Sequence, residues 1–314
     1  MTTNNAIICP LTKTNSAYPY LTIPVSLITD VYRKQFSIDV SRFFTGKSNI
    51  YVYKCRETGY KFYHPPGVEG DGKFYEDLYS PGSVEKSELS WKDEFQIAYD
   101  LVKQGDKVLD IGCSEGTFLL RAKEKASVHG LELNANSCQR CIALGLDVKN
   151  ELVEKHVQYA AGTYDVVTAF QVLEHVYDVQ SFLDSCVKLL KPGGKLVLAT
   201  PSNEPFFLGY DVYTPLNMPP HHMGLWNVNV YRSLEKLFPL KFVSVNYTGQ
   251  GRVVVYAYYR ARNIANVKSL KREHTKTEWL KIAAAAAIAL PHAIFKKISS
   301  GIHGSFITVV FEKK

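Results

Sequence analysis

Apolar and polar positions alternate in blocks through the middle of the chain. Short, almost continuously apolar runs occur at 108–111, 165–169 and 195–200. Between them lie longer segments in which apolar residues recur every three or four positions. The first pattern is typical of strands buried on both faces of a parallel sheet, and the second is typical of amphipathic helices. The pattern therefore predicts an α/β fold with a doubly wound, mostly parallel sheet.

The remaining elements are predicted around these runs. A helix ends at Lys191, residues 192–194 (Pro-Gly-Gly) form a turn, and the strand over 195–200 follows. Further helices are predicted over 91–103, 116–126, 134–144 and 228–238, and further strands near Val128 and over 147–150, 241–247 and 306–311. The chain thus divides into an extension at 1–90 and an α/β domain at 91–314, of which 201–314 carries a histidine-containing loop, the last strands and an apolar helix.

The end of the first predicted strand carries the most distinctive chemistry. Residues 108–119 read VLDIGCSEGTFL, so Asp110 lies near the carboxyl end of a strand, where open α/β sheets bind ligands. Gly112 and Gly116 follow with the spacing G-x-x-x-G, not the G-x-G-x-x-G of dinucleotide-binding proteins. A carboxylate at Asp110 would repel a pyrophosphate and attract a cationic or amine-bearing ligand. The structural alternative is that Asp110 only caps the next helix.

Three further segments follow in a matching order, namely VHGLELN at 128–134, YDVVTAFQVLEHV at 164–176 and LLKPGGKLVLATP at 189–201. Together with residues 108–119 they resemble the class I S-adenosylmethionine-dependent methyltransferases, and in particular bacterial enzymes of glycan, sugar and small-molecule pathways. The resemblance covers residues 91–200. It implies a Rossmann-like, seven-stranded sheet whose last strand is antiparallel, with S-adenosyl-L-methionine as the cofactor.

The resemblance also assigns roles to residues at the strand ends. In that family an acid at the end of the second strand bonds both ribose hydroxyls of the donor, and Glu132 occupies this position. The alternative for Glu132 is an ordinary surface acid. Ser114 stands where the family usually has glycine, a departure that bears on donor affinity. The implied donor-binding residues are Asp110, Gly112, Ser114, Gly116, Glu132, Leu133, Glu151, Leu152, Phe170 and Gln171.

Histidines supply the candidate catalytic base. His221 and His222 lie in the loop PPHHMGLW at 219–226, which follows the fifth predicted strand and is therefore expected above the ligand edge of the sheet. A neutral imidazole near pH 7 can take a proton from an acceptor hydroxyl, and His175 is a further candidate. The alternative is that these histidines only pack or bond locally.

The run that contains Glu174 and His175 raises the question whether the protein binds a divalent metal. Quinone-type O-methyltransferases share a related E-x-x-E-H run, in which two acids and the histidine are linked to a metal. Here Gln171 replaces the first acid. Because an amide is a poor substitute for a carboxylate toward Mg²⁺, we expect no metal.

The first 90 residues contain a predicted hairpin, formed by 50–55 and 60–63. Their layout resembles the N-terminal module of glycan-pathway methyltransferases, in which two CxxC knuckles often hold zinc. Each knuckle here keeps one cysteine, Cys9 or Cys55. Two thiolates do not complete a tetrahedral site, so no zinc is predicted. We expect this module to cover the acceptor site through Phe74, Tyr75 and Tyr79.

Composition bears on location and partners. The 314 residues carry a net charge of +7 and six scattered cysteines, and no signal-peptide pattern opens the chain, so we expect a cytoplasmic protein with reduced thiols. Residues 251–314 hold 12 Lys and Arg against 3 Asp and Glu, which suits either an anionic partner or a solvated basic surface. Nucleic acid is disfavoured as a partner, because no groove-like set of aromatic residues is interleaved with the basic ones.

An apolar, alanine-rich run at 282–290 lies within a longer helical segment, 279–297. The run is too short to span a bilayer, which needs about 20 apolar residues. Lysines at both ends suit a helix at the membrane interface, in peripheral contact with the inner membrane face. A buried helix or a dimer contact fits the run equally well, and the sequence leaves the oligomeric state open.

These patterns predict an enzyme that transfers the methyl group of S-adenosyl-L-methionine to an oxygen of a small-molecule or glycan-pathway acceptor. Two alternatives stay open. A catalytically silent relative would keep the fold as a binding module, which the departures at Ser114 and Gln171 favour. A nicotinamide-dependent oxidoreductase on a similar sheet is disfavoured by the glycine spacing and by Asp110.

Overall fold

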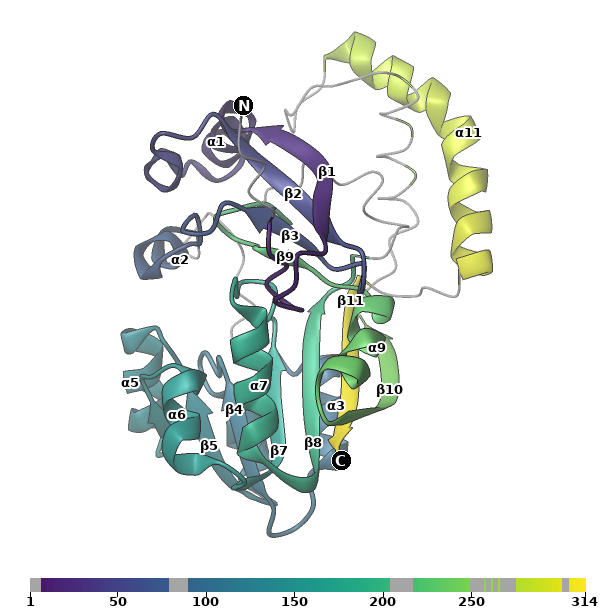
Figure 1. The fold of residues 1–314 in the computed structure, drawn as a ribbon. Helices are drawn as coiled ribbons and strands as arrows, with labels where there is room; N and C mark the ends of the chain where they lie inside the picture. The colour runs from purple at the N-terminus through teal and green to yellow at the C-terminus, as the bar shows by residue number, and fades with distance from the viewer. Residues whose placement is uncertain are drawn as a thin grey trace.

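A computed structural model describes residues 7–78, 90–203, 217–248, 257, 261, 265, 275–300 and 305–314. These residues form two sheets with flanking helices (Figure 1). The larger sheet has seven strands in the order β10-β11-β8-β7-β4-β5-β6. Its strands are β4 (Lys107–Ile111), β5 (Ser127–Leu131), β6 (Asp147–Lys149), β7 (Tyr164–Phe170), β8 (Leu190–Pro201), β10 (Leu240–Thr248) and β11 (Phe306–Lys313).

Strand directions confirm the fold class. The pairs among β4, β5, β6, β7 and β8 are all parallel, whereas β11 runs antiparallel to both β8 and β10. The predicted doubly wound sheet, with an antiparallel last strand, is therefore correct. In this order β5 and β6 lie on one side of β4, and β7 and β8, which follow later in the chain, lie on the other side. The strand order therefore reverses at β4, and such a switch point is where open α/β sheets bind ligands.

Successive residues of the central strands enter two different cores. Val108 packs with the helices on one face and Leu109 with those on the other, and Val166 and Val167 divide in the same way. A strand with apolar residues at consecutive positions can be buried only when both faces of the sheet are covered. One face carries α3 (Asp93–Leu101), α4 (Thr117–Ala122) and α5 (Ala135–Ala143), and the other carries α6 (Val153–Ala160), α7 (Val179–Leu189) and α9 (Val228–Leu237).

The smaller sheet joins the N-terminal residues to the loop that holds the histidines. Its order is β1-β2-β3-β9, and all of its strand pairs are antiparallel. The predicted hairpin is confirmed as β2 and β3, and β9 is a two-residue strand from the loop that follows β8 in the chain. The elements are β1 (Ala17–Pro24), α1 (Val25–Phe36), η1 (Ser41–Phe44), β2 (Asn49–Cys55), β3 (Lys61–His64), α2 (Gly72–Leu78) and β9 (Gly224–Leu225). The N-terminal sheet therefore holds the histidine loop in place.

Several predicted boundaries differ from the structure. The helix expected to end at Lys191 ends at Leu189, and β8 begins at Leu190, so residues 192–194 belong to the strand. The helix expected through Ala126 ends at Ala122, after which the chain makes turn-like bonds from Lys125 and Ala126 to the carbonyl of Ala122. Boundaries of this kind depend on local hydrogen bonds that a periodic pattern does not record.

The C-terminal helix α11 (Lys276–Ser300) is longer than predicted and continues through Pro291. Its residues Ile282, Ala285 and Ala289 pack with Ala261, whereas Leu280 is 71% exposed. Among the described residues, no helix combines the length and the apolar character that crossing a membrane requires.

Candidate functional site

The loop between β4 and α4 requires glycine at two positions. Gly112 has a φ of +72° and Gly116 a φ of +73°, values that L side chains rarely adopt. A side chain would also force its neighbours to shift, because a Cβ on Gly112 would lie 2.5 Å from Cγ2 of Val172, and one on Gly116 would lie 2.5 Å from Cδ1 of Leu146. The two glycines that the sequence singled out thus let the loop turn tightly against neighbouring segments.

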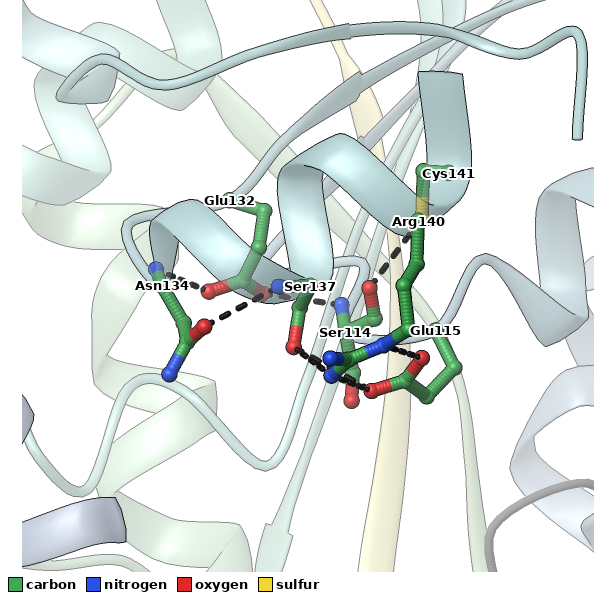
Figure 2. Close-up of polar contacts among 7 residues, drawn as sticks. All are labelled: Ser114, Glu115, Glu132, Asn134, Ser137, Arg140 and Cys141. Atoms are coloured by element: carbon green, nitrogen blue, oxygen red, sulfur yellow. Dashed lines mark hydrogen bonds and ion pairs between the residues drawn. The ribbon is translucent and has the colours of Figure 1, made fainter. Parts of the chain in front are cut away.

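Glu132 ties this loop to the end of β5 (Figure 2). Its Oε2 accepts a hydrogen bond of 2.9 Å from the main-chain N–H of Ser114, and its Oε1 accepts one of 2.6 Å from the N–H of Asn134. A carboxylate offers about four lone-pair positions, so each oxygen can accept a further hydrogen bond. Ser114 itself has a φ of +50°, which explains why glycine would suit this position.

A second acid fastens the same loop to α5. Glu115 accepts hydrogen bonds from Arg140 at 2.7 and 2.5 Å and from the hydroxyl of Ser137 at 3.2 Å (Figure 2). The thiol of Cys141 donates to the carbonyl of Ser114 at 3.2 Å. Hydrogen bonds to Glu132 after β5 and to side chains of α5 therefore fix the conformation of the loop without a ligand.

Asp110 lies at the end of β4 and is only 3% exposed. Its Oδ1 accepts a 2.7 Å hydrogen bond from the hydroxyl of Thr168 on the adjacent strand β7. Burial raises the pKa of Asp110 to about 7, and the negative charge of Glu132 adds to this effect. The neutral and charged forms are thus nearly balanced at neutral pH, and a cation bound beside Asp110 would favour the charged form.

The candidate donor-binding residues that follow β5 and β6 differ in whether their side chains are exposed or already bound within the protein. Leu133 and Leu152 are 62% and 56% exposed, so both present apolar surface near the strand ends. The side chain of Asn150 donates to the carbonyls of Glu132 and Leu133 at 2.7 and 2.9 Å and so links the two segments. Glu151, by contrast, is bound by the side chains of His156, Lys155 and Tyr159 of α6.

Phe170 and Gln171 end β7 beside β4. Phe170 is 8% exposed and packs edge-on against Phe95 and Phe118, with ring centroids 4.9 and 5.2 Å away. Gln171 has a φ of +56°, and its buried Nε2 has no hydrogen-bond partner among the described residues. An unpaired buried amide nitrogen is uncommon and marks a place where a ligand could accept a hydrogen bond.

The structure brings the three candidate histidines together. The rings of His221 and His222 stack with centroids 4.5 Å apart, and the ring of His175 lies 4.7 Å and 4.9 Å from them. Nδ1 of His175 donates to the carbonyl of His221 at 2.6 Å and lies 3.1 Å from the hydroxyl of Tyr75. The N-terminal segment therefore contributes Tyr75 directly to the cluster. Tyr79, which the sequence analysis also named for the cover, lies outside the described residues.

Burial keeps these imidazoles neutral. It lowers the pKa of His175 to about 4 and lowers the pKa values of His221 and His222 well below the usual 6.5. His221 and His222 are 6% and 4% exposed, while the side chain of His175 is 23% exposed. Among the three, His175 is the one that a bound molecule reaches most easily.

Glu174 connects the cluster to the small sheet. Its carbonyl accepts hydrogen bonds from the N–H groups of Met223 and Gly224 at 2.8 and 3.1 Å. Its side chain is 1% exposed, and burial raises the pKa of the carboxyl to about 8, with a contribution from the charge of Glu94. Oε2 of Glu174 has no hydrogen-bond partner among the described residues.

Two residues of the site could not be singled out from the sequence. Thr168, which bonds Asp110, is one of several β-branched residues in a strand pattern. Asn217, whose Oδ1 lies 3.2 Å from Nδ1 of His222, stands in a loop with no periodicity. Both act through partners that are distant in sequence, and a single chain carries no signal for such pairs.

Comparisons with known proteins agree with this geometry. Residues 85–239 match a family model described as a methyltransferase domain. Two ubiquinone biosynthesis O-methyltransferases, from Erwinia tasmaniensis and Pectobacterium atrosepticum, are 43% and 44% identical over 103 residues, which are 31% of this chain and 42% and 43% of theirs. The chain thus matches less than half the length of these curated relatives.

Among solved structures, protein PH0226 from Pyrococcus horikoshii is similar in fold. It aligns with a TM-score of 0.51 and 11% identity, over 78% of this chain and 100% of its own. Such a low identity supports the fold alone. The family model, however, spans every strand from β4 to β8 and includes the glycine loop, Glu132 and the histidines. Residues 85–239 therefore belong to the methyltransferase domain family.

Proposed function

We propose that this protein transfers the methyl group of S-adenosyl-L-methionine to a hydroxyl oxygen of a small-molecule acceptor. The observation that carries the proposal is the arrangement of two acids around one glycine loop. Asp110 and Glu132 stand at the ends of adjacent parallel strands, and Gly112 and Gly116 turn the chain between them. Carboxylates at this edge suit a ligand that combines a positive charge with a pair of hydroxyl groups.

The residues present fit this donor. Each oxygen of Glu132 keeps a lone pair after its main-chain bonds, which is what two adjacent ribose hydroxyls need. Asp110 is buried with a raised pKa, so a cationic group nearby stabilises its charged form. The exposed side chains of Leu133 and Leu152 offer apolar contact for a base. Glu151 is occupied on α6 and is the weakest of the proposed donor contacts.

Bound at this edge, S-adenosyl-L-methionine would supply a methyl group made electrophilic by its sulfonium. The new oxygen–carbon bond forms while the carbon–sulfur bond breaks, and its electron pair passes to sulfur. The protein positions the acceptor oxygen in line with that bond, at about 3 to 3.5 Å from the methyl carbon. The proton of the acceptor passes to an imidazole of the cluster, with His175 in first place because it is the most exposed.

The acceptor belongs to the same proposal. The curated relatives are named for O-methylation in ubiquinone biosynthesis, which supports an oxygen acceptor and a small molecule. The N-terminal module and the histidine loop resemble those of glycan-pathway enzymes, and this favours a sugar-like acceptor. Tyr75 supports a cover role for the module, because its hydroxyl reaches from helix α2 to within 3.1 Å of Nδ1 of His175.

The direct test separates donor binding from turnover. Calorimetry with S-adenosylhomocysteine should show one site per chain, and Asp110→Asn should weaken it at pH 8. Incubation with methyl-labelled donor and a panel of sugars and phenols should then label an acceptor. If the product binds and no acceptor in lysate fractions takes the label, the silent binding module becomes the better description. A thermal shift with NAD(P) instead of S-adenosylhomocysteine would favour the oxidoreductase.

A second part of the proposal is independent of the first: a cytoplasmic protein that contacts an anionic membrane surface peripherally. The observations that support it come from helix α11. Trp279, Leu280 and Ile288 are 49%, 71% and 63% exposed on a helix that also carries Lys276 and Lys281. Flotation with vesicles of mixed neutral and anionic lipids should carry the protein upward. Leu280→Glu with Ile288→Glu should abolish flotation, and equal flotation of this variant would exclude the helix as the contact.

A further inference from the structure

The histidine cluster has a geometry that base catalysis does not require. One ring nitrogen from each of His175, His221 and His222 can be chosen so that the three atoms all lie within 4.8 Å of one another. The rings come from the turn after β7 and from the loop before β9, segments that are more than 40 residues apart. A general base needs one imidazole, whereas three neutral imidazoles at this separation make a ligand set.

The outer hydrogen bonds leave suitable nitrogens free. Nδ1 of His175 bonds the carbonyl oxygen of His221, which can only accept, so Nδ1 carries the proton and Nε2 keeps its lone pair. Nδ1 of His222 bonds Oδ1 of Asn217 in the same way. Histidines that bind metals almost always donate their other ring N–H to an oxygen of this kind, which fixes the tautomer and the ring orientation.

Buried polar atoms without partners gather beside the cluster. Among the described residues, Nδ1 of His221 and Oε2 of Glu174 have no hydrogen-bond partner, although both residues are more than nine-tenths buried. The other carboxyl oxygen of Glu174, Oε1, lies 4.0 Å from Nε2 of His175. Buried polar atoms are nearly always paired in proteins, and an ion, like a water molecule, would satisfy a nitrogen and a carboxyl oxygen together.

We propose that His175, His221 and His222 bind one divalent transition-metal ion, with Zn²⁺ as the reference ion. Imidazole nitrogen suits Zn²⁺ and its neighbours in the first transition row, whereas Mg²⁺ prefers oxygen. Three histidines with an open fourth position are a known arrangement for catalytic zinc. At a zinc–nitrogen distance of 2.0–2.1 Å, tetrahedral ligand atoms stand about 3.4 Å apart. The rings of His221 and His222, which now stack at an interplanar angle of 19°, must therefore rotate relative to each other when the ion binds.

This inference revises the expectation of no metal. That expectation considered the run from Gln171 to His175 and found one carboxylate missing for an oxygen site. It treated His221 and His222 only as bases, because their contact with His175 depends on how the loop before β9 folds back. The ligand set assembled here has a different chemistry, with nitrogen in place of oxygen.

The role of the ion rests on the proposed function, whereas its binding does not. A Lewis acid next to the acceptor would lower the pKa of a bound hydroxyl, so that its proton would pass to water before methyl transfer. Oε1 of Glu174 lies 4.0 Å from Nε2 of His175, and the positive charge of a bound ion would favour the charged form of this carboxyl. With all three imidazoles bound to the ion, His175 no longer acts as the base, and the ion takes over that part of the proposed function.

Metal binding can be measured without an acceptor. Tag-free full-length protein, stripped with a chelator, should take up one equivalent of Zn²⁺ in competition with a chromogenic chelator. Each of His175→Ala, His221→Ala and His222→Ala should weaken uptake by about a hundredfold or more, and Asn217→Ala by about tenfold. His129→Gln is the matched control, because this histidine of β5 pairs with Asp147 outside the cluster.

A spectrum of the unmodified protein keeps the test decisive if a variant does not fold. Co²⁺ should give the visible bands of a nitrogen-ligated tetrahedral ion, without sulfur-to-metal charge transfer. Failure to take up one equivalent, uptake unchanged in all three histidine variants, or a sulfur-ligated spectrum would each overturn the proposal. S-adenosylhomocysteine affinity measured on the same samples separates the two proposals, because a protein that binds the nucleoside and no metal refutes only the metal site.

Discussion

The main-chain N–H of Ser114 donates a 2.9 Å hydrogen bond to the carboxylate of Glu132 (Figure 2). One acid at the end of β5 thereby holds the loop that follows β4, while its second oxygen accepts from the N–H of Asn134. The carboxylate is thus oriented by the backbone before a donor arrives. A ligand that bonds this carboxylate need not spend free energy on ordering it.

Replacing Glu132 tests this arrangement. In Glu132→Gln, the amide nitrogen would face a main-chain N–H, and charge-assisted bonds would be lost. A hydrogen bond to a charged group contributes about 1.5–3 kcal/mol, so we expect S-adenosylhomocysteine to bind roughly tenfold to a hundredfold more weakly by calorimetry. Glu115→Gln is the control, because Glu115 bonds Arg140 in the same loop. Equal losses in the two variants would mean that Glu132 acts only on the loop.

Ser114→Gly should stabilise the protein. Ser114 holds a φ of +50°, which costs an L residue about 1–2 kcal/mol, and glycine adopts it freely. Part of this gain is offset by the greater flexibility of glycine in the unfolded chain, so we expect a net gain of about 1 kcal/mol in urea unfolding. Gly112→Ala should do the opposite, since a methyl group there would collide with Val172. A Ser114→Gly variant less stable than the parent would show that the serine hydroxyl makes a necessary contact.

Asp110 should make both stability and donor binding depend on pH. The folded protein holds its proton up to about pH 7, whereas the unfolded chain releases it near 3.8. Its contribution to stability is therefore full below pH 4 and is lost as the pH rises toward 7. Each unit of pKa is worth about 1.4 kcal/mol, so Asp110→Asn should gain on the order of 4 kcal/mol relative to the parent between pH 4 and pH 8 in urea unfolding.

The affinity for the donor should change with pH in the direction opposite to stability. A cationic donor favours the charged carboxylate of Asp110, so its affinity should rise with pH up to about 7 and a proton should be released on binding below that pH. Calorimetry in buffers of different ionisation enthalpy measures that proton directly. In Asp110→Asn the proton release should vanish. An unchanged release in that variant would assign the proton to another group, such as Glu174.

Part of this site was readable from the sequence because local rules determine it. The apolar runs and G-x-x-x-G fix strand, turn and helix within a dozen residues, and both glycines have the positive φ that such a turn needs. The histidine cluster could be predicted only in part. His221 and His222 stood out as a pair, but their contact with His175 and Tyr75 depends on the pairing of β9 with β3, and a two-residue strand leaves no periodic signal. Long-range contacts of this kind are set by tertiary packing.

The N-terminal knuckles offer a gain-of-function test of the zinc argument. Cys9 forms hydrogen bonds with the side chain of Thr12 and with nearby main-chain N–H groups, and Cys55 forms them with the side chains of Ser16 and Thr58. The hydroxyl of Thr12 lies 4.0 Å from the sulfur of Cys55. The backbone thus still surrounds each thiol as a knuckle does, and a threonine stands at the position of each missing ligand.

Thr12→Cys combined with Thr58→Cys should therefore create a four-thiolate zinc site. We expect one more equivalent of Zn²⁺ than the parent takes up, a sulfur-to-metal charge-transfer band with Co²⁺, and a higher melting temperature in the presence of zinc, because a closed tetrahedral site stabilises the fold that forms it. Thr12→Ser with Thr58→Ser is the control and should gain none of these. If the cysteine variant binds no additional ion, the two missing thiols are not the only difference between this module and a zinc knuckle, and the backbone around Cys9 and Cys55 differs as well.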